Sequence, residues 1–118
     1  MSGIDTRSMI DKVNHTHCCY CRRRFSEIIK HLTRTMDHFF PTSRLGHNKR
    51  VNKLQCCHEC NQWKADKLPS IWLHEVQVSF DKRKVKGHYQ LRDYAQIIGS
   101  LKHWIATLKD EIIGEYKL

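Results

Sequence analysis

The sequence predicts a small α+β domain, and three observations lead to that prediction. Two Cys-x-x-Cys pairs bracket a middle stretch that contains short, strand-like apolar runs. The pairs are Cys18 with Cys21 and Cys57 with Cys60. A short helical pattern follows the second pair, and a long amphipathic helical pattern occupies the end of the chain. With 118 residues, the chain is long enough for one domain with a modest hydrophobic core.

The chain is strongly basic, and the excess of positive charge is concentrated in the middle. It contains 21 Lys and Arg against 12 Asp and Glu, which gives a formal net charge of +9. Residues 22–67 alone hold eleven of the basic residues against four acidic ones. A positive excess gathered on one segment is typical of proteins that bind a polyanion such as DNA.

The first residues show no targeting signal. Residues 1–14 lack an apolar run and a small-residue cleavage site, and no window approaches the roughly 18 apolar residues of a membrane span. We therefore expect a cytoplasmic protein that has no membrane partner. Thiols stay reduced in that compartment, so the six cysteines favour metal binding over disulfides.

The residues before the strands predict two short helical pieces. Residues 1–17 form an N-terminal extension, in which Ile10 and Val13 lie one helical turn apart and predict a short helix. After the first cysteine pair, apolar residues recur at helical spacing and predict one or two turns with a buried face. These residues are Phe25, Ile28, Ile29 and Leu32.

Two strands joined by a basic loop are predicted next. Residues 35–40 are rich in strand formers and are ended by Pro41. Residues 42–51 are polar and basic, as expected of a loop, and residues 52–56 form the second strand. A helix then opens at Asn61. The order is strand, loop, strand, helix.

The rest of the chain is a helical extension. Pro69 stops or redirects the preceding helix, so we place the core at residues 18–69 and the extension at 70–118. Residues 70–76 predict a helical segment, and the alternation of Val76, Val78 and Phe80 predicts a short strand. A charged turn follows.

The clearest helix of the sequence covers residues 91–117. Its apolar residues form one stripe, which we expect to pack on the core or on a partner, so the helix is a candidate homodimer surface. The stripe comprises Tyr94, Ile97, Ile98, Leu101, Trp104, Ile105, Leu108 and Ile112.

The two cysteine pairs predict a structural zinc site. A gap of two residues lets both thiolates of a pair face one ion, and zinc in structural sites takes four such ligands in a tetrahedron. Cys18, Cys21, Cys57 and Cys60 are the four candidates. Other donors lie nearby, namely Cys19, Cys56, His15, His17 and His58. Because Cys56 falls in the second strand, we expect it to pack as a small apolar residue. The alternative is a set of free buried thiols or disulfides.

Between the cysteine pairs lie Asp37-His38, which is followed by Pro41, and then Asn52; Asn61 comes directly after the second pair. This pattern resembles the HNH (ββα-metal) endonuclease family. The resemblance covers about residues 18–67. It implies that His38 is the general base and that Asp37 binds the catalytic metal. It also implies that Asn52 holds the loop through hydrogen bonds to the backbone and that Asn61 completes the metal site.

The chemistry of phosphodiester hydrolysis agrees with these residue types. It needs a proton acceptor for water, which a neutral imidazole provides, and a cation on the phosphate oxygens. Carboxylate and amide oxygens favour Mg²⁺ or Mn²⁺ as that cation. Asp37 and His38 are neighbours on a strand and would point to opposite sides, so we expect a distorted or bulged strand to bring both to one site.

Basic residues around these positions are candidates for contacts with the phosphates of duplex DNA. They are Arg44, Lys49, Arg50 and Lys53 on the hairpin and Lys64 on the helix. The preferred function is a metal-dependent DNA endonuclease. The alternative is a non-catalytic, zinc-stabilised nucleic-acid-binding module with the same fold.

Overall fold

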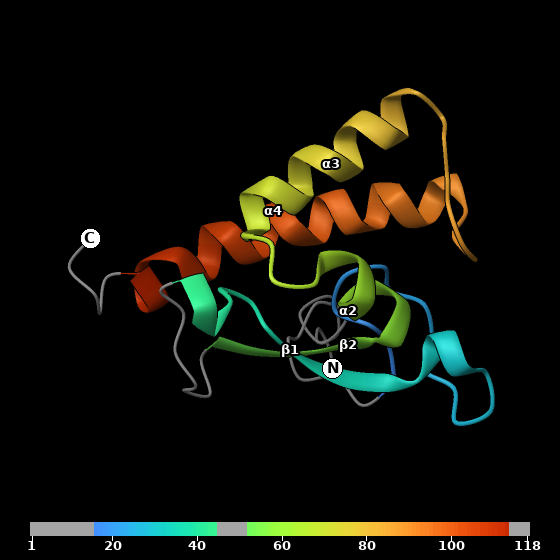
Figure 1. Ribbon diagram of the computed structural model, residues 1–118, viewed down its shortest axis with the longest axis horizontal. Helices are drawn as coiled ribbons and strands as arrows, with labels where there is room; N and C mark the ends of the chain where they lie inside the picture. Colours follow the sequence, from blue (N-terminus) through green and yellow to red (C-terminus); the bar gives the residue numbers. More distant parts are fainter. Residues whose placement is uncertain (1–15, 45–51, 114–118) are drawn as a thin grey trace, which may run out of the picture.

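The computed structural model describes residues 16–44 and 52–113, with residues 44 and 109–113 as backbone only. The elements in chain order are η1 (Lys30–Leu32), β1 (Arg34–His38), η2 (Thr42–Arg44), β2 (Lys53–Cys57), α2 (His58–Lys64), α3 (Pro69–Asp81) and α4 (Leu91–Ile113) (Figure 1). This architecture confirms the predicted α+β class with a strand–loop–strand–helix core. The short helix predicted around Ile10 and Val13 lies outside the described residues, as do residues 45–51 of the loop.

The sheet consists of β1 and β2, which pair antiparallel in an uninterrupted register from Arg34 opposite Cys57 to His38 opposite Lys53. The expected bulge before Pro41 is therefore absent from the strand, which ends at His38. Alternation along β1 turns the buried Asp37 toward the core, whereas His38 is only partly buried. The two residues thus leave opposite faces of the sheet at its end.

Helix α2 begins three residues earlier than the sequence suggested, because a cysteine caps it. Cys57 is the N-cap, and its Sγ accepts a hydrogen bond of 3.4 Å from the backbone N–H of Cys60. The usual N-cap residues are Ser, Thr, Asp and Asn, and a thiol seldom takes this role. The sequence therefore did not indicate that the helix begins at His58. The second cysteine pair consequently lies on the first turn of α2, and Asn61 follows within the helix.

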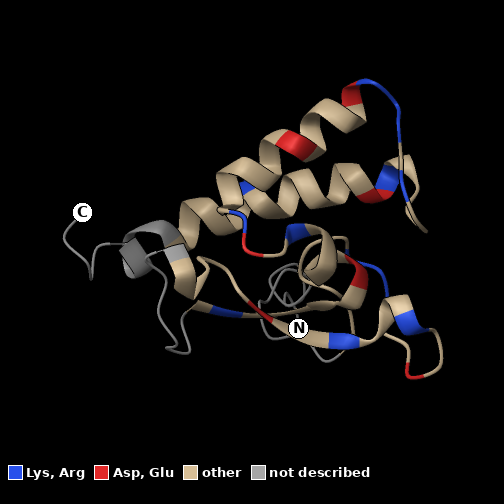
Figure 2. Cartoon of the chain, in the orientation of Figure 1, with Lys and Arg blue, Asp and Glu red and all other residues tan. Residues whose placement is uncertain are grey.

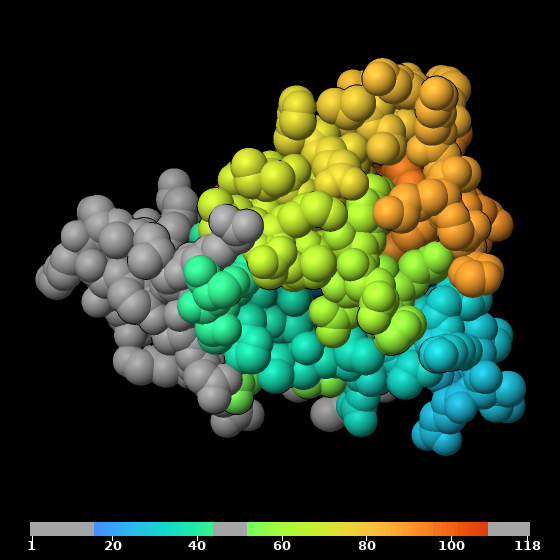
Figure 3. All heavy atoms as spheres, in the orientation of Figure 1, coloured from blue at the N-terminus to red at the C-terminus, as the bar shows by residue number. Residues whose placement is uncertain are grey.

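The segment after the first cysteine pair differs from the prediction. It forms one 3-10 turn, and Ile28 and Ile29 are 94% and 46% exposed, so the predicted buried face is wrong for both. The hydroxyl of Ser26 accepts the backbone N–H groups of Ile28 and Ile29, which closes a local turn in place of a helix. This segment projects from one end of the molecule (Figure 3). Phe25 and Leu32 do pack against the core.

Residues 69–81 form one continuous helix, so the strand predicted at Val76, Val78 and Phe80 is wrong. Pro69 lies in the first helical turn, where its missing N–H costs no hydrogen bond, and it starts the helix. The buried residues Trp72 and Val76 are four apart and share one face, which packs along α4 (Figure 1).

The apolar stripe of α4 packs inside the chain. Tyr94, Ile97, Leu101, Trp104 and Leu108 are all buried. The helix is described as far as residue 113, and the side chain of residue 112 is outside the described part. Because this stripe contributes to the chain's own core, a homodimer through α4 would need a different face of the helix. Among the described residues, no helix is both long and apolar enough to cross a membrane.

The helical extension and the cysteine-bearing segment share one hydrophobic core. The hydroxyl of Ser100 donates to the carbonyl of Tyr20 at 2.8 Å, and the indole N–H of Trp104 donates to the carbonyl of Cys19 at 3.2 Å. Trp63 of α2 packs edge-on against Trp72 of α3. Residues on both sides of position 70 are therefore needed to bury the same side chains.

Candidate metal centre and active site

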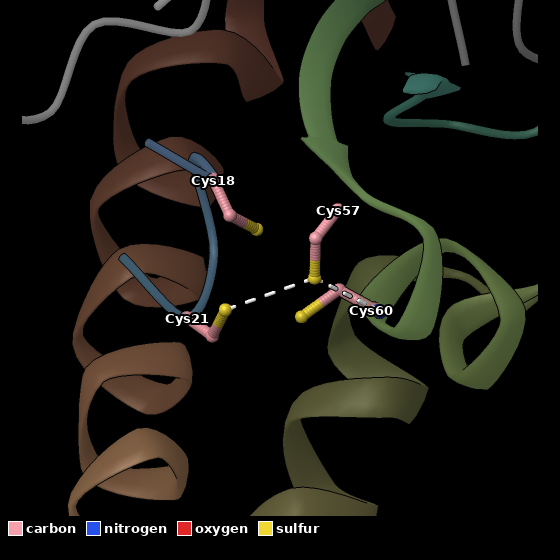
Figure 4. A group of neighbouring side chains, drawn as sticks. All are labelled: Cys18, Cys21, Cys57 and Cys60. Carbon is pink, nitrogen blue, oxygen red and sulfur yellow. Dashed lines mark hydrogen bonds between the residues drawn. The ribbon is translucent and has the colours of Figure 1, made fainter. Parts of the chain in front are cut away.

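Four buried cysteines meet at one point (Figure 4). Cys18 and Cys21 come from the turn before η1, and Cys57 and Cys60 come from the junction of β2 and α2. Their Sγ atoms lie within 4.8 Å of one another, and Cys21 Sγ is 3.8 Å from Cys57 Sγ. A tetrahedron with Zn–S bonds of about 2.3 Å has an edge of about 3.8 Å. The cluster therefore fits one structural zinc ion, and Cys19 and Cys56 are not part of it.

The remaining two thiols, those of Cys19 and Cys56, are buried in the core. Burial raises the pKa of both Cys19 and Cys56, which keeps these groups protonated. The hydroxyl of Thr35 lies 3.6 Å from Cys56 Sγ. In the cluster itself, hydrogen bonds from neighbouring thiols, Cys18 first, lower the pKa of Cys57, whereas burial raises the pKa of Cys18 and of Cys60.

Donors around the cluster point at its sulfur atoms. The backbone N–H of Tyr20 reaches Cys18 Sγ at 3.3 Å, and Nε of Arg23 reaches Cys21 Sγ at 3.1 Å. The hydroxyl of Tyr89 donates to Cys60 Sγ at 3.3 Å. Such donors orient thiolate ligands and offset the negative charge of a four-cysteine zinc site.

Sequence reasoning missed the parts played by Arg23 and Tyr89. The guanidinium of Arg23 also lies over the Tyr89 ring, 4.4 Å from its centroid. Tyr89 belongs to the connection between α3 and α4, so the extension supplies one donor to the cysteine cluster. A cation two residues after a Cys-x-x-Cys pair is a weak signal by itself, because only the fold turns it toward the sulfurs.

A pocket of about 230 Å³ lies at the end of β1. It brings together three of the residues predicted to form the site, which are Asp37, His38 and Asn61. Its other walls come from β1, from the turn after it and from the residues that follow α2, through Met36, Pro41, Thr42, Ser43, Ala65 and Asp66. Although Asp37 and His38 leave opposite faces of the strand, both reach this pocket because it opens where the strand ends.

Asn61 is fixed to β1 by its amide nitrogen. Nδ2 donates to Thr35 Oγ1 at 3.0 Å and to the carbonyl of Met36 at 3.4 Å. These two bonds use the amide hydrogens, so the amide oxygen is the end that can bind a cation.

Asn52 lies behind the pocket and holds the chain that leaves β1. Its Oδ1 accepts the backbone N–H of Phe40 and its Nδ2 donates to the carbonyl of Phe40, both at 2.8 Å. Its own carbonyl accepts the N–H of Phe39 at 2.8 Å. The side chain is fully buried, so these bonds have no competition from water. Asn52 thereby fixes the backbone immediately after His38.

Lys64 lies in a position that the sequence did not suggest. We expected a phosphate contact, but the side chain is fully buried, with Nζ 3.1 Å from Asp37 Oδ2 and 3.1 Å from the carbonyl of His38. The hydroxyl of Tyr20 donates to Asp37 Oδ2 at 2.6 Å. Burial raises the pKa of Asp37, and the nearby ammonium of Lys64 acts in the opposite direction.

The other predicted phosphate contacts are only partly described. Lys53 is partly buried on β2 and lies opposite His38 in the sheet. Arg44 ends η2, and Lys49 and Arg50 lie outside the described residues. Figure 2 shows basic residues on β1 and along the connection between α3 and α4, so the positive charge is not confined to the pocket.

Comparison with known proteins found one family model that matches the core. Residues 18–70 match the family model described as HNH endonuclease. No significant match was found among curated proteins or among solved structures. The segment that carries the cysteine cluster and the pocket is therefore similar to the HNH endonuclease family, whose nuclease-type function agrees with a nucleic-acid partner and with divalent metals. The match ends at the second residue of α3.

Proposed function

We propose that this protein is a metal-dependent DNA endonuclease that hydrolyses phosphodiester bonds with His38 as its general base. The observation that best supports the proposal is the pocket at the end of β1, because it gathers an imidazole, a carboxylate and an amide from two elements. These are the groups that phosphodiester hydrolysis requires from a protein with one catalytic cation.

Asp37 and Asn61 are the residues that would hold the catalytic cation. Within the described chain, Asp37 Oδ1 accepts one hydrogen bond, from Lys64 at 3.5 Å, the outer limit of such a bond, so this oxygen retains the capacity to bind a cation. The amide oxygen of Asn61 is the second ligand. Two oxygen donors with open positions suit Mg²⁺ or Mn²⁺. The bound cation would stabilise negative charge on the phosphate and on the leaving oxygen.

His38 would accept the proton of the attacking water. Its carbonyl accepts a hydrogen bond from Lys64, and the backbone N–H groups of the next two residues donate to Asn52. A fixed backbone keeps the imidazole near the same position before and during the reaction, which is what a general base needs.

Nicking of a supercoiled plasmid tests the proposal. Wild-type protein should nick with Mg²⁺ or Mn²⁺ and should stop when EDTA is present. His38→Ala should lower the rate by about 10²–10⁴-fold, the usual contribution of a positioned base. The control is His74→Ala, which changes an exposed histidine on α3. Asp37→Ala and Asn61→Ala should recover part of their activity in excess Mn²⁺, whereas His38→Ala should not.

A non-catalytic, zinc-stabilised nucleic-acid-binding module is the second candidate. The ion pair between Lys64 and Asp37 favours it, since the carboxylate already has a positive partner. Purified wild-type protein that binds duplex DNA but does not nick it with either metal would make this alternative the correct one. Folded His38→Ala protein that nicks at the wild-type rate would show that another group is the base.

A further inference from the structure

We propose that His31, Glu59 and His88 form a second, transition-metal site that fastens the connection between α3 and α4 to the nuclease core. This site is separate from the four-cysteine cluster and from the pocket at the end of β1. It goes beyond the proposed endonuclease function and does not depend on it.

The three residues come from three segments that are far apart in the sequence. His31 is in η1, Glu59 is in the first turn of α2, and His88 is in the connection between α3 and α4. One ligand atom of each lies within 4.8 Å of the other two. Figure 3 shows the α3–α4 connection, in orange, against the η1 segment, in cyan, at one end of the molecule.

The two imidazoles already stack on each other. Their ring centroids are 3.7 Å apart, and the ring planes differ by 7°. An ion lies in the plane of each imidazole that binds it, so coordination requires the rings to tilt out of parallel. The side chain of His88 is 62% exposed, which leaves room for that rotation.

Hydrogen bonds and an ion pair hold the carboxylate of Glu59 in place. Glu59 Oε2 accepts the backbone N–H of His88 at 2.9 Å and lies 3.2 Å from His88 Nδ1. Glu59 Oε1 pairs with Arg23 at 3.0 Å. The side chain of Glu59 is 15% exposed, so it is ordered by these partners rather than solvated.

The donor set selects a class of metal. Two imidazole nitrogens and one carboxylate oxygen suit Zn²⁺, Ni²⁺ or Co²⁺, whereas Mg²⁺ prefers oxygen donors alone. Three protein ligands leave one or more positions for water. The site therefore differs in preference from the oxygen-rich pocket proposed for catalysis.

Binding here would tighten the region around the structural cysteines. The carbonyl of His88 accepts from Arg23 at 3.4 Å, and Arg23 also donates to Cys21 Sγ. Tyr89, next to His88, donates to Cys60 Sγ. An ion on His31, Glu59 and His88 would fix the same connection at a second point. Any ligand that binds only the folded state also adds stability by mass action.

The test is a titration of tag-free protein that already contains one zinc per chain. Isothermal titration with Ni²⁺ should show one further ion for wild type. His31→Ala and the volume-conserving His88→Gln should each weaken that binding by at least about tenfold. His74→Ala and His38→Ala should bind the ion as wild type does, which separates the site from stray surface histidines and from the catalytic pocket.

Hydrogen exchange gives a second readout. Ni²⁺ should slow exchange across residues 84–90 in wild type and leave it unchanged in His88→Gln, with zinc content equal in both. The proposal is overturned if zinc-loaded wild type takes up no further Ni²⁺, or if both histidine variants bind it as tightly as wild type does. A second ion lost in His38→Ala instead would place it in the catalytic pocket and would equally overturn the proposal.

Discussion

Replacing Lys64 with Met would expose how the buried carboxylate of Asp37 is tolerated. The side chain of Lys64 is 0% exposed and that of Asp37 is 5% exposed, so neither charge has water to stabilise it. Met has nearly the same length and keeps the packing, which leaves the loss of the ammonium as the main change. Removing one partner of a buried ion pair typically costs about 3–5 kcal/mol, because the other charge stays buried without compensation.

Two features of the site set where the loss should fall in that range. The hydroxyl of Tyr20 remains bonded to Asp37, which keeps part of the stabilisation of the carboxylate. Asp37 can also escape by taking up a proton, and at pH 7 that costs about 1.36 kcal/mol for each of roughly three pH units above its usual pKa, or about 4 kcal/mol. We therefore expect a loss of about 3–4 kcal/mol at pH 7.

The direction in which the stability of Lys64→Met changes with pH tests whether the buried charge of Asp37 causes the loss. In Lys64→Met, the folded-state pKa of Asp37 lies above its unfolded value, so the variant loses stability as pH rises from the unfolded value through the folded one. The deficit relative to wild type should consequently shrink at pH 5, where a proton is easier to take up. The cost of protonation there is only about 1.5 kcal/mol.

Urea denaturation of zinc-loaded protein at pH 7 and pH 5 measures these losses. The double variant Lys64→Met with Asp37→Asn should recover most of the stability at pH 7, because no buried charge remains. Lys102→Met, on an exposed part of α4, is the matched control and should change little. A loss below about 1 kcal/mol for Lys64→Met, the size of an exposed ion pair, would refute the reasoning, as would an equal loss at both pH values.

Three further predictions concern the metal, the loop and the DNA surface. Cys57→Ser should remove zinc and unfold the protein, since structural zinc contributes about 10–16 kcal/mol in small domains, whereas Cys19→Ser should keep its zinc; metal analysis and thermal melting distinguish the two. Asn52→Ala should cost about 2–6 kcal/mol in urea denaturation, because two buried backbone groups lose their partners at about 1–3 kcal/mol each. Lys53→Ala should lower the slope of log affinity for duplex DNA against log salt by about one, and Lys102→Ala should not. An unchanged slope for Lys53→Ala would place the DNA surface elsewhere.

The parts of the fold that the sequence could predict are those specified by short-range pattern. The stripe on α4 repeats over several turns, and only a helix puts all of its members on one side. The spacing of the cysteine pairs likewise requires a particular local geometry. The secondary structure of residues 76–80 could not be predicted in this way, because Val76 and Phe80 fit a helical face while Val76, Val78 and Phe80 fit an alternating strand. The contact with α4 decides between the two, and it is not visible in a short window.

Residues whose role depends on a distant partner could not be assigned from sequence. In the sequence, Lys64 resembles an ordinary lysine on a helix. Only the packing of α2 against β1 places its ammonium beside Asp37. Arg23 reads as one member of a basic run, yet it faces the cysteine cluster and Glu59. In both cases a long-range contact places the side chain beside negatively charged groups, and the residue type alone does not predict that contact.

The boundary of the family match does not coincide with the boundary of the folded unit. The match ends at residue 70, yet Trp63 of the matched segment packs on Trp72 and on Tyr94 beyond it. The hydroxyl of Tyr89 reaches a cysteine of the cluster, and Trp104 donates to the backbone of the first cysteine pair. Without α3 and α4, the side chain of Trp63 would lose the aromatic residues that bury it. The extension is therefore a structural part of the same folded core as the matched segment.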